Sequence, residues 1–135
     1  MRSKEAGSYM KNTLALVLMV IGIVGCSTPY QSKNITGGYT ETQISENVWK
    51  VSAAGNAFTS TPKLNDYALL RASELTINKG YKYFVVVNKQ RDGLWNTNEL
   101  FFEMTNDKKD ESGALAFTYN AKMLYQSLSE KYLKD

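Results

Sequence analysis

Between residues 62 and 79, the sequence repeats with the spacing of an amphipathic helix. Five positions fit the i, i+3, i+4, i+7, i+11 rule and share one helical side: Leu64, Tyr67, Ala68, Arg71 and Leu75. Pro62 suits the first helical turn, where its missing N–H is not needed, and Thr61 before it is an N-cap candidate. Lys79 and Gly80 supply a basic last turn and a glycine stop. The pattern predicts a helix over residues 62–79.

Several other segments have the composition or the alternation of β-strands. Residues 48–58 and 99–105 alternate between apolar and polar positions, which places successive side chains on opposite faces of a strand. Residues 81–88 are mostly β-branched or aromatic, which is typical of a buried strand. The predicted strands are residues 39–44, 48–58, 81–88, 99–105 and 114–119. Turns or loops are predicted at residues 45–47, 90–98 and 106–113.

A second helix is predicted after Asn120, which is an N-cap candidate. Its apolar stripe comprises Ala121, Leu124, Tyr125, Leu128 and Tyr132. The order strand, strand, helix, three strands, helix favours the α+β class: a small, mostly antiparallel sheet of four to five strands with two amphipathic helices on one face. Residues 39–135 are predicted to form this single domain. The polar residues 27–38 are predicted to be a flexible tether.

The first 25 residues have the organisation of a cleaved signal peptide. Arg2, Lys4 and Lys11 make residues 1–12 basic, and residues 13–25 are uncharged and mostly Leu, Val, Ile and Met. A helix of this apolar length reaches about 20 Å, whereas a bilayer core is about 30 Å thick. A cleaved signal is therefore favoured over the alternative, an uncleaved signal anchor.

The only cysteine of the chain, Cys26, follows this segment and cannot form an internal disulfide. Residues 23–26, Ile-Val-Gly-Cys, resemble a bacterial lipobox, at which the chain is cut between Gly25 and Cys26. The resemblance implies diacylglycerol on the Cys26 sulfur and, in many bacteria, an acyl group on the new amine. A buried structural or redox cysteine is the alternative. Ser27 stands where many inner-membrane lipoproteins carry Asp, so the resemblance favours the outer membrane, with the domain facing the periplasm.

Charge and residue content exclude several classes of function. Residues 1–25 carry three basic residues and one acidic residue, so the rest of the chain keeps little of the net charge of +3, and no nucleic-acid partner is expected. The absence of histidine excludes His-based triads and His-bearing metal clusters. We expect no metal, no cofactor other than the lipid, and no enzymatic activity. The remaining enzymatic alternatives are a Ser–Lys pair or a cluster of Glu41, Glu74 and Arg71 beside a cleft.

Three residues are candidates for an interaction surface: Trp95, Phe101 and Arg71. Trp95 lies in a polar loop, where it either packs back under the loop or faces a partner. Phe101 lies on the face of its predicted strand opposite to the apolar face. Arg71 lies on the apolar side of the predicted helix, where it extends its charged end to solvent, pairs with Glu74, or marks a docking surface.

Two longer stretches, GGYTETQISENVWKVSAAGNAFTS and DYALLRASELTINKGYKYFVVVN, resemble a family of small bacterial lipoproteins of unassigned function. The resemblance covers residues 37–88 and implies no catalytic residue. Its polar signature comprises Tyr39, Glu41, Gln43, Asn47, Gly55, Asn56, Asp66, Arg71 and Glu74. Either a polar network between the first strand and the helix or a binding site explains this set.

The sequence as a whole predicts an outer-membrane-anchored periplasmic lipoprotein. Its expected role is that of a structural or assembly component of the cell envelope that acts through protein contacts. The alternative is a module that binds a small or lipidic ligand in an apolar cleft between helix and sheet.

Overall fold

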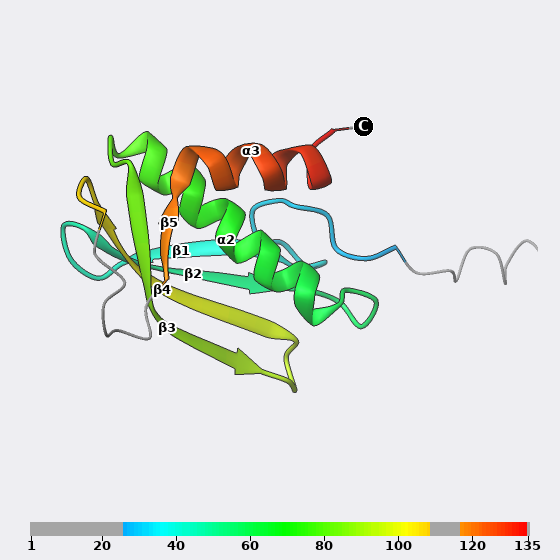
Figure 1. Cartoon of the computed structure of the whole chain (residues 1–135). Coiled ribbons are helices and arrows are strands. Elements are labelled where there is room, and N and C mark those ends of the chain that lie inside the picture. The colour runs from blue at the N-terminus through cyan, green and yellow to red at the C-terminus, as the bar shows by residue number, and fades with distance from the viewer. Residues whose placement is uncertain (1–25, 109–116, 135) are drawn as a thin grey trace, which may run out of the picture.

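The computed structural model describes residues 26–108 and 117–134, which form a sheet covered on one face by two helices (Figure 1). The strands are β1 (Gly38–Gln43), β2 (Val48–Ala54), β3 (Tyr83–Asp92), β4 (Thr97–Thr105) and β5 (Thr118–Asn120). The helices are α2 (Thr61–Asn78) and α3 (Ala121–Tyr132). The sheet order is β1-β2-β4-β3-β5, and all neighbouring strands are antiparallel. The predicted α+β fold is confirmed.

Helix α2 is buried along most of its length, because its apolar side lies on the sheet and α3 covers part of the rest. Its buried residues are Leu64, Tyr67, Ala68, Leu69, Leu70, Ala72, Ser73, Leu75 and Thr76. The hydroxyl groups of the buried Ser73 and Thr76 donate to carbonyls one turn earlier, Ser73 Oγ to Leu69 O and Thr76 Oγ1 to Ala72 O. Burial of these polar side chains therefore leaves no hydroxyl donor unsatisfied.

The strand register decides which side chains face the helices. Val51 pairs with Leu100, and both are buried beneath α2. Their neighbours Lys50 and Phe101 also pair with each other and point to the opposite face, because successive side chains of a strand alternate. We call the sheet face turned away from α2 and α3 the far face.

The ends of several elements differ from the sequence prediction. Ser60, and not Thr61, is the N-cap of α2, because the Ser60 hydroxyl accepts from the Lys63 amide. β2 ends at Ala54, four residues earlier than expected. β3 and β4 extend to Asp92 and Thr97, so most of the predicted loop 90–98 is a paired hairpin with a turn at residues 93–96. Of the predicted strand 114–119, residues 114–116 lie outside the described residues.

The segment after Cys26 packs against the domain, in contrast to the predicted flexible tether over residues 27–38. Thr28 is only 1% exposed. Its amide donates to Thr59 Oγ1, and its carbonyl accepts from the hydroxyl of Tyr67 on α2. The ring of Tyr30 packs against the rings of Tyr39 and Tyr67, with centroids 4.7 and 5.5 Å away. The polar composition that suggested a linker instead supplies hydrogen bonds to the domain.

Two consecutive glycines let this segment turn into β1 at close range. Gly37 and Gly38 have φ angles of 109° and 128°, which side chains of L-residues rarely allow. A Cβ atom on Gly37 would lie 2.6 Å from the carbonyl oxygen of Ala54, and one on Gly38 would lie 2.5 Å from that of Gln31. The folded domain therefore begins at about Thr28 rather than at Tyr39.

Replacement of Thr28 by valine is expected to destabilise the domain by about 2 kcal/mol, because it removes two partly buried hydrogen bonds to backbone groups. The Thr28 hydroxyl donates to Thr36 O and accepts from the Asn56 amide, and valine can do neither. Urea unfolding of Thr28→Val measures the loss. Thr42→Val, on the exposed side of β1, is the matched control. Equal stability changes in the two variants would contradict this account.

Candidate functional site

Cys26 lies at the surface where the folded domain begins. Its thiol is free and exposed, and its carbonyl oxygen accepts a 2.9 Å hydrogen bond from Asn56 Nδ2. Two residues later Thr28 is buried, and between them the Ser27 hydroxyl accepts from Lys63 Nζ of α2. A group attached to the Cys26 sulfur would thus be held directly against the domain, with no length of free chain between them.

Asn56 belongs to the loop of residues 55–60, which is also bonded to the turn of the β3–β4 hairpin. The side chain of Asn96 donates to Asn56 O at 2.8 Å and to Thr59 O at 2.9 Å. The Gly55 amide donates back to Asn96 O. Asn96 has a φ of 45°, a conformation that asparagine adopts more readily than most residues. We call this region, made of Cys26, residues 55–60 and residues 93–96, the attachment end.

Trp95 lies on the attachment end and faces solvent. It is 73% exposed and its neighbour Leu94 is 85% exposed. The carboxylate of Asp92 accepts from the amides of both residues, which fixes the backbone of the turn. The predicted packing of Trp95 under its loop is therefore wrong, whereas its contact with a partner stays a prediction.

The other two candidate residues do not lie on the same surface as Trp95. Phe101 is on the far face, where the ammonium group of Lys50 lies 5.9 Å from its ring centroid. Lys50 also pairs with Glu99 at 3.1 Å. Arg71 is on the helix-covered side, in contact with β1. The structure thus separates Trp95, Phe101 and Arg71 into three regions, and their roles in interaction remain predictions.

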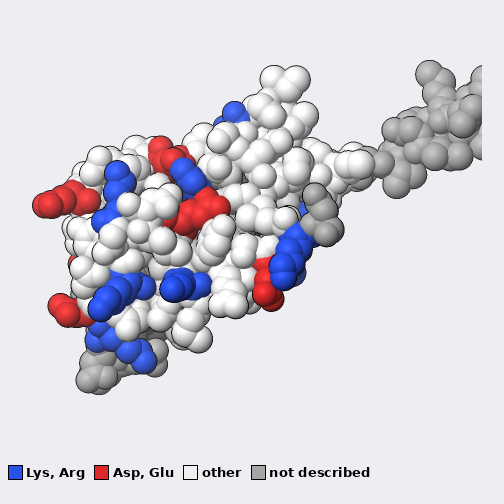
Figure 2. Space-filling model, turned by 90° about the horizontal axis from the view of Figure 1, so that it is seen from above, with Lys and Arg blue, Asp and Glu red and all other residues white. Residues whose placement is uncertain are grey.

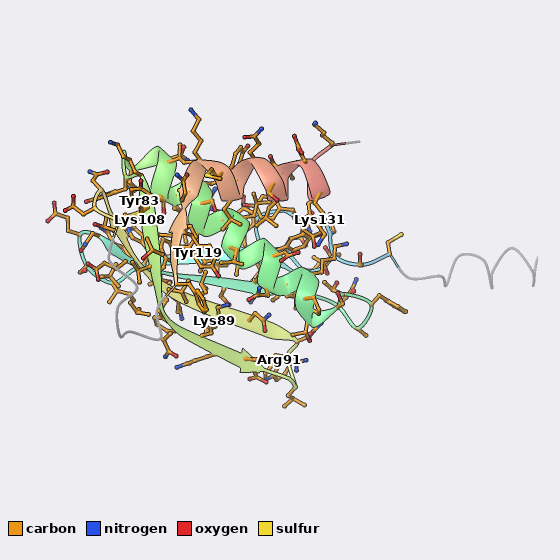
Figure 3. All side chains as sticks on the ribbon, viewed as in Figure 1. Tyr83, Lys89, Arg91, Lys108, Tyr119 and Lys131 are labelled. Carbon is orange, nitrogen blue, oxygen red and sulfur yellow. The ribbon has the colours of Figure 1, made fainter. Side chains whose placement is uncertain are left out.

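A groove of about 640 Å³ lies between the N-terminal segment and the β3–β4 hairpin. It is lined by Lys33, Ser52, Gln90, Arg91, Asp92, Gly93, Trp95, Thr97 and Glu99. Register places Ser52, Gln90 and Glu99 on the far face. Arg91 lies on β3 next to the hairpin turn (Figure 3). Both signs of charge line this groove, which suits a polar or charged ligand better than a lipid chain.

The space between helix and sheet differs from the apolar cleft that was an alternative expectation. There, a hollow of about 200 Å³ is bordered by Asn65, Ala68, Leu100 and the polar residues of the hairpin. Its volume is below the 300–1,000 Å³ or so of most ligand pockets.

Arg71 joins α2 to β1 through a cluster of ion pairs. Its guanidinium donates to both carboxylate oxygens of Glu41, at 2.7 and 3.0 Å, and to Glu74 at 2.8 Å. The Tyr30 hydroxyl donates to the same oxygen of Glu74 at 2.7 Å. Arg71 also lies over the ring of Tyr39, with Cζ 4.8 Å from its centroid. Four of the nine residues of the predicted polar signature thus meet in a network between the first strand and the helix, which was one of the two interpretations of that signature.

The electrostatics of this cluster favour a structural role. The hydrogen bonds to Glu41 raise the pKa of Arg71 above its ordinary value, against the opposing effect of burial. Burial raises the pKa of Tyr30, and the hydrogen bond to Glu74 raises it further. Both carboxylates are bound by a permanent cation, and none of the cluster residues lines the 640 Å³ groove. The arrangement links the N-terminal segment, β1 and α2 rather than presenting a reactive group.

Charges on the helix side are interspersed, without a large area of either sign (Figure 2). Within residues 26–108 and 117–134, no group of three or more acidic or cysteine side chains gathers to hold a metal ion. None of the helices in this described part is both long and apolar enough to cross a membrane.

Comparison of the chain with protein-family models, with curated proteins and with solved structures found no match. The interpretation of this chain therefore depends on its own residues and geometry.

Replacement of Arg71 by alanine is expected to cost about 2 kcal/mol of unfolding free energy, because Glu41 and Glu74 lose charge-assisted hydrogen bonds in a half-buried site. Lys134→Ala is the control, since its 3.6 Å pair with Glu130 is exposed and such pairs contribute little. Thermal unfolding of the two variants measures the difference. A loss as small as that of the control would show that the Arg71 cluster does not hold β1 to α2.

The raised pKa of Tyr67 predicts how the stability of the domain responds to alkaline pH. Burial, with a smaller contribution from Tyr132, raises the pKa of Tyr67 to about 12 from 10.0. The unfolded chain therefore loses this proton first, so this group's contribution is complete below pH 10 and decreases as the pH rises towards 12. The expected slope is about 1.4 kcal/mol per pH unit for one proton.

Urea unfolding between pH 10 and 12 tests this with Tyr67→Phe, which cannot titrate at that position. The variant is expected to lose a smaller amount of stability at neutral pH, because Thr28 O loses its hydroxyl donor, but to show a shallower alkaline slope. The same slope in both proteins would contradict the assignment.

Proposed function

We propose that this protein is a lipoprotein of the bacterial cell envelope, anchored through Cys26 in the outer membrane on its periplasmic side. Its domain acts as a structural or assembly component through contacts with another envelope protein. The observation that carries the proposal is the exposed, free Cys26 thiol two residues before the buried Thr28, directly after a basic and then apolar segment.

Lipid attachment accounts for a cysteine in this position better than the other roles of a thiol. A structural cysteine is usually buried, and a redox pair needs a second cysteine, which the chain lacks. Each buried methylene group of an acyl chain contributes about 0.8 kcal/mol to membrane binding, so two or three chains give a stable anchor. The exposed Cys26 leaves its sulfur free to carry them.

The far face is the surface that best fits a protein partner. The helices cover only the other side of the sheet, and the half-buried Phe101 lies among polar and charged neighbours such as Lys50 and Glu99. An aromatic side chain surrounded by polar groups is the usual arrangement at the centre of a protein interface. β1 is an edge strand of the sheet and borders this face. The Tyr39 backbone already bonds to Gln31 and Lys33, so further pairing is proposed only for the residues of β1 after Tyr39.

A second candidate function is the binding of a small polar ligand in the 640 Å³ groove. Lys33 and Arg91 could bind an anionic group of such a ligand, while Trp95 could stack on an apolar or sugar-like face. This candidate keeps the predicted small-ligand alternative but replaces a lipidic ligand by a charged one.

The anchor is tested by expressing the full chain in a Gram-negative bacterium and measuring the intact mass of the membrane-extracted protein. The expected product begins at Cys26 and carries diacylglycerol and an acyl group. Cys26→Ser removes this modification, whereas Ser27→Ala, the matched control one residue later, retains it. An unmodified Cys26 in the wild-type protein would refute the anchor.

The partner is tested in the same cells with a photoreactive phenylalanine analogue at Phe101. The control carries the analogue at Met123, an exposed residue of α3 on the other side of the molecule. A discrete adduct from position 101 that is absent from position 123 and lost in Cys26→Ser would support an assembly role. Equal adducts from both positions, or none, would count against it and favour a search for a ligand in the groove.

A further inference from the structure

The chain leaves almost no distance between Cys26 and the folded domain. Asn56 holds the Cys26 carbonyl at 2.9 Å, Lys63 binds the Ser27 hydroxyl, and Thr28 is buried. Polar linkers that separate an anchor from a domain have no such contacts. If acyl chains on Cys26 enter a bilayer, the surface around Cys26 must therefore reach the lipid headgroups.

That surface exposes several large apolar side chains. Leu94 and Trp95 form the tip of the β3–β4 hairpin, and Phe58, 60% exposed, lies in the loop 55–60 that Asn96 ties to this hairpin. Ile35 is fully exposed in the turn next to Thr36, whose carbonyl accepts from the Thr28 hydroxyl. Figure 1 shows the start of the described chain, the loop before α2 and the β3–β4 turn at one end of the domain.

These apolar residues are held in place by hydrogen bonds rather than by a core. One Asn96 side chain bonds to both Asn56 and Thr59, and Asn56 in turn bonds to Cys26. The same few residues thus position the anchor and the hairpin tip. Transfer of exposed apolar side chains from water into a less polar medium is favourable, and a rigid loop already holds them in place for it.

The polar groups of this end suit an interface of lipid headgroups. Arg91 lies beside the hairpin turn and Lys63 lies beside Ser27. Lys131, which pairs with Asp66 at 2.9 Å, lies in the last turn of α3 at the same end (Figure 3). Basic side chains near a membrane surface are attracted to phosphate groups, and tryptophan is enriched at the boundary between headgroups and acyl chains.

We propose that the attachment end, together with Ile35, is a membrane-contacting surface that seats the domain directly on the bilayer. Leu94, Trp95 and Phe58 enter the interfacial layer, and the strands stand with their β1–β2 turn away from the membrane. The inference rests on the lipid anchor proposed above and adds a contact surface and an orientation to it. It assigns Trp95 to lipid rather than to a protein partner.

Tryptophan fluorescence tests this orientation, because the chain has only two tryptophans. Trp49→Phe leaves Trp95 as the single reporter, and it removes a buried indole N–H that has no hydrogen-bond partner among the described residues, so the fold should tolerate it. The matched control is the triple variant Trp49→Phe, Trp95→Phe, Ile44→Trp. Ile44 is exposed and follows β1 at the end opposite to the Ala54–Gly38 pair.

Both full-length proteins, expressed and processed in the bacterium, are placed in vesicles of phosphatidylethanolamine and phosphatidylglycerol, with and without phosphatidylcholine brominated near the headgroup. The expected result is a blue shift of Trp95 emission and its quenching by the brominated lipid, while the tryptophan at position 44 shows neither. An unshifted, unquenched Trp95 would overturn the proposal and leave the hairpin tip available to a protein. Equal quenching at both positions would overturn the orientation.

The intact mass of each sample separates this proposal from that of the anchor. Native lipid on Cys26 combined with a water-exposed Trp95 refutes only the membrane-contacting surface. An unmodified Cys26 refutes the native anchor, and the same fluorescence measurement is then made after coupling the thiol to a maleimide lipid in the vesicles. Because Cys26 is the sole cysteine, this coupling restores an anchor at the same sulfur.

Discussion

The packing of helix α2 against the sheet is the constraint on which the rest of this structure depends. Its buried side contacts the middle strands, while Tyr67 and Asp66 turn towards α3, where Tyr132 packs on the first at 5.2 Å and bonds to the second at 2.6 Å. The same helix receives the N-terminal segment through Tyr67 and Glu74. The sheet, α3 and the N-terminal segment therefore all pack on this one helix, which is more buried than an ordinary amphipathic helix.

The consequence for function lies at the N-terminus of that helix. Ser60 caps α2, and the loop before it carries Asn56, which bonds to Cys26, and Thr59, which accepts from the Thr28 amide. Because this loop is fixed to the helix, the residue proposed to carry lipid is fixed to the domain as well. A membrane anchor of this kind would restrict orientation and not only location, since rotation about a long flexible linker is not available.

The attachment end and the far face then differ in what they can contact. The attachment end presents exposed apolar side chains with Arg91 and Lys63 beside it, whereas the far face presents Phe101 next to the Lys50–Glu99 ion pair. The Arg71 cluster belongs to neither surface, because its donors and acceptors bond to one another between β1, α2 and Tyr30. The structure therefore places Trp95, Phe101 and Arg71 in three separate regions, although the sequence alone grouped them together.

The sequence by itself determined the α+β class, the two helices and the core positions of the strands, because periodicity of 3.6 or 2 residues records which face of each element is buried. It also marked Cys26 as a candidate lipidation site, because the residues next to it in the chain form the motif that suggests this role. Only the tertiary structure decided that residues 28–38 pack on the domain, that the polar residues 89–92 remain in a strand, and that Asn96 joins the hairpin to Asn56. These outcomes depend on hydrogen bonds between residues distant in sequence, such as Thr28 with Thr59 and Tyr67. A polar residue that bonds to a distant partner has the same local pattern as one in a solvated loop, so the pattern cannot distinguish them.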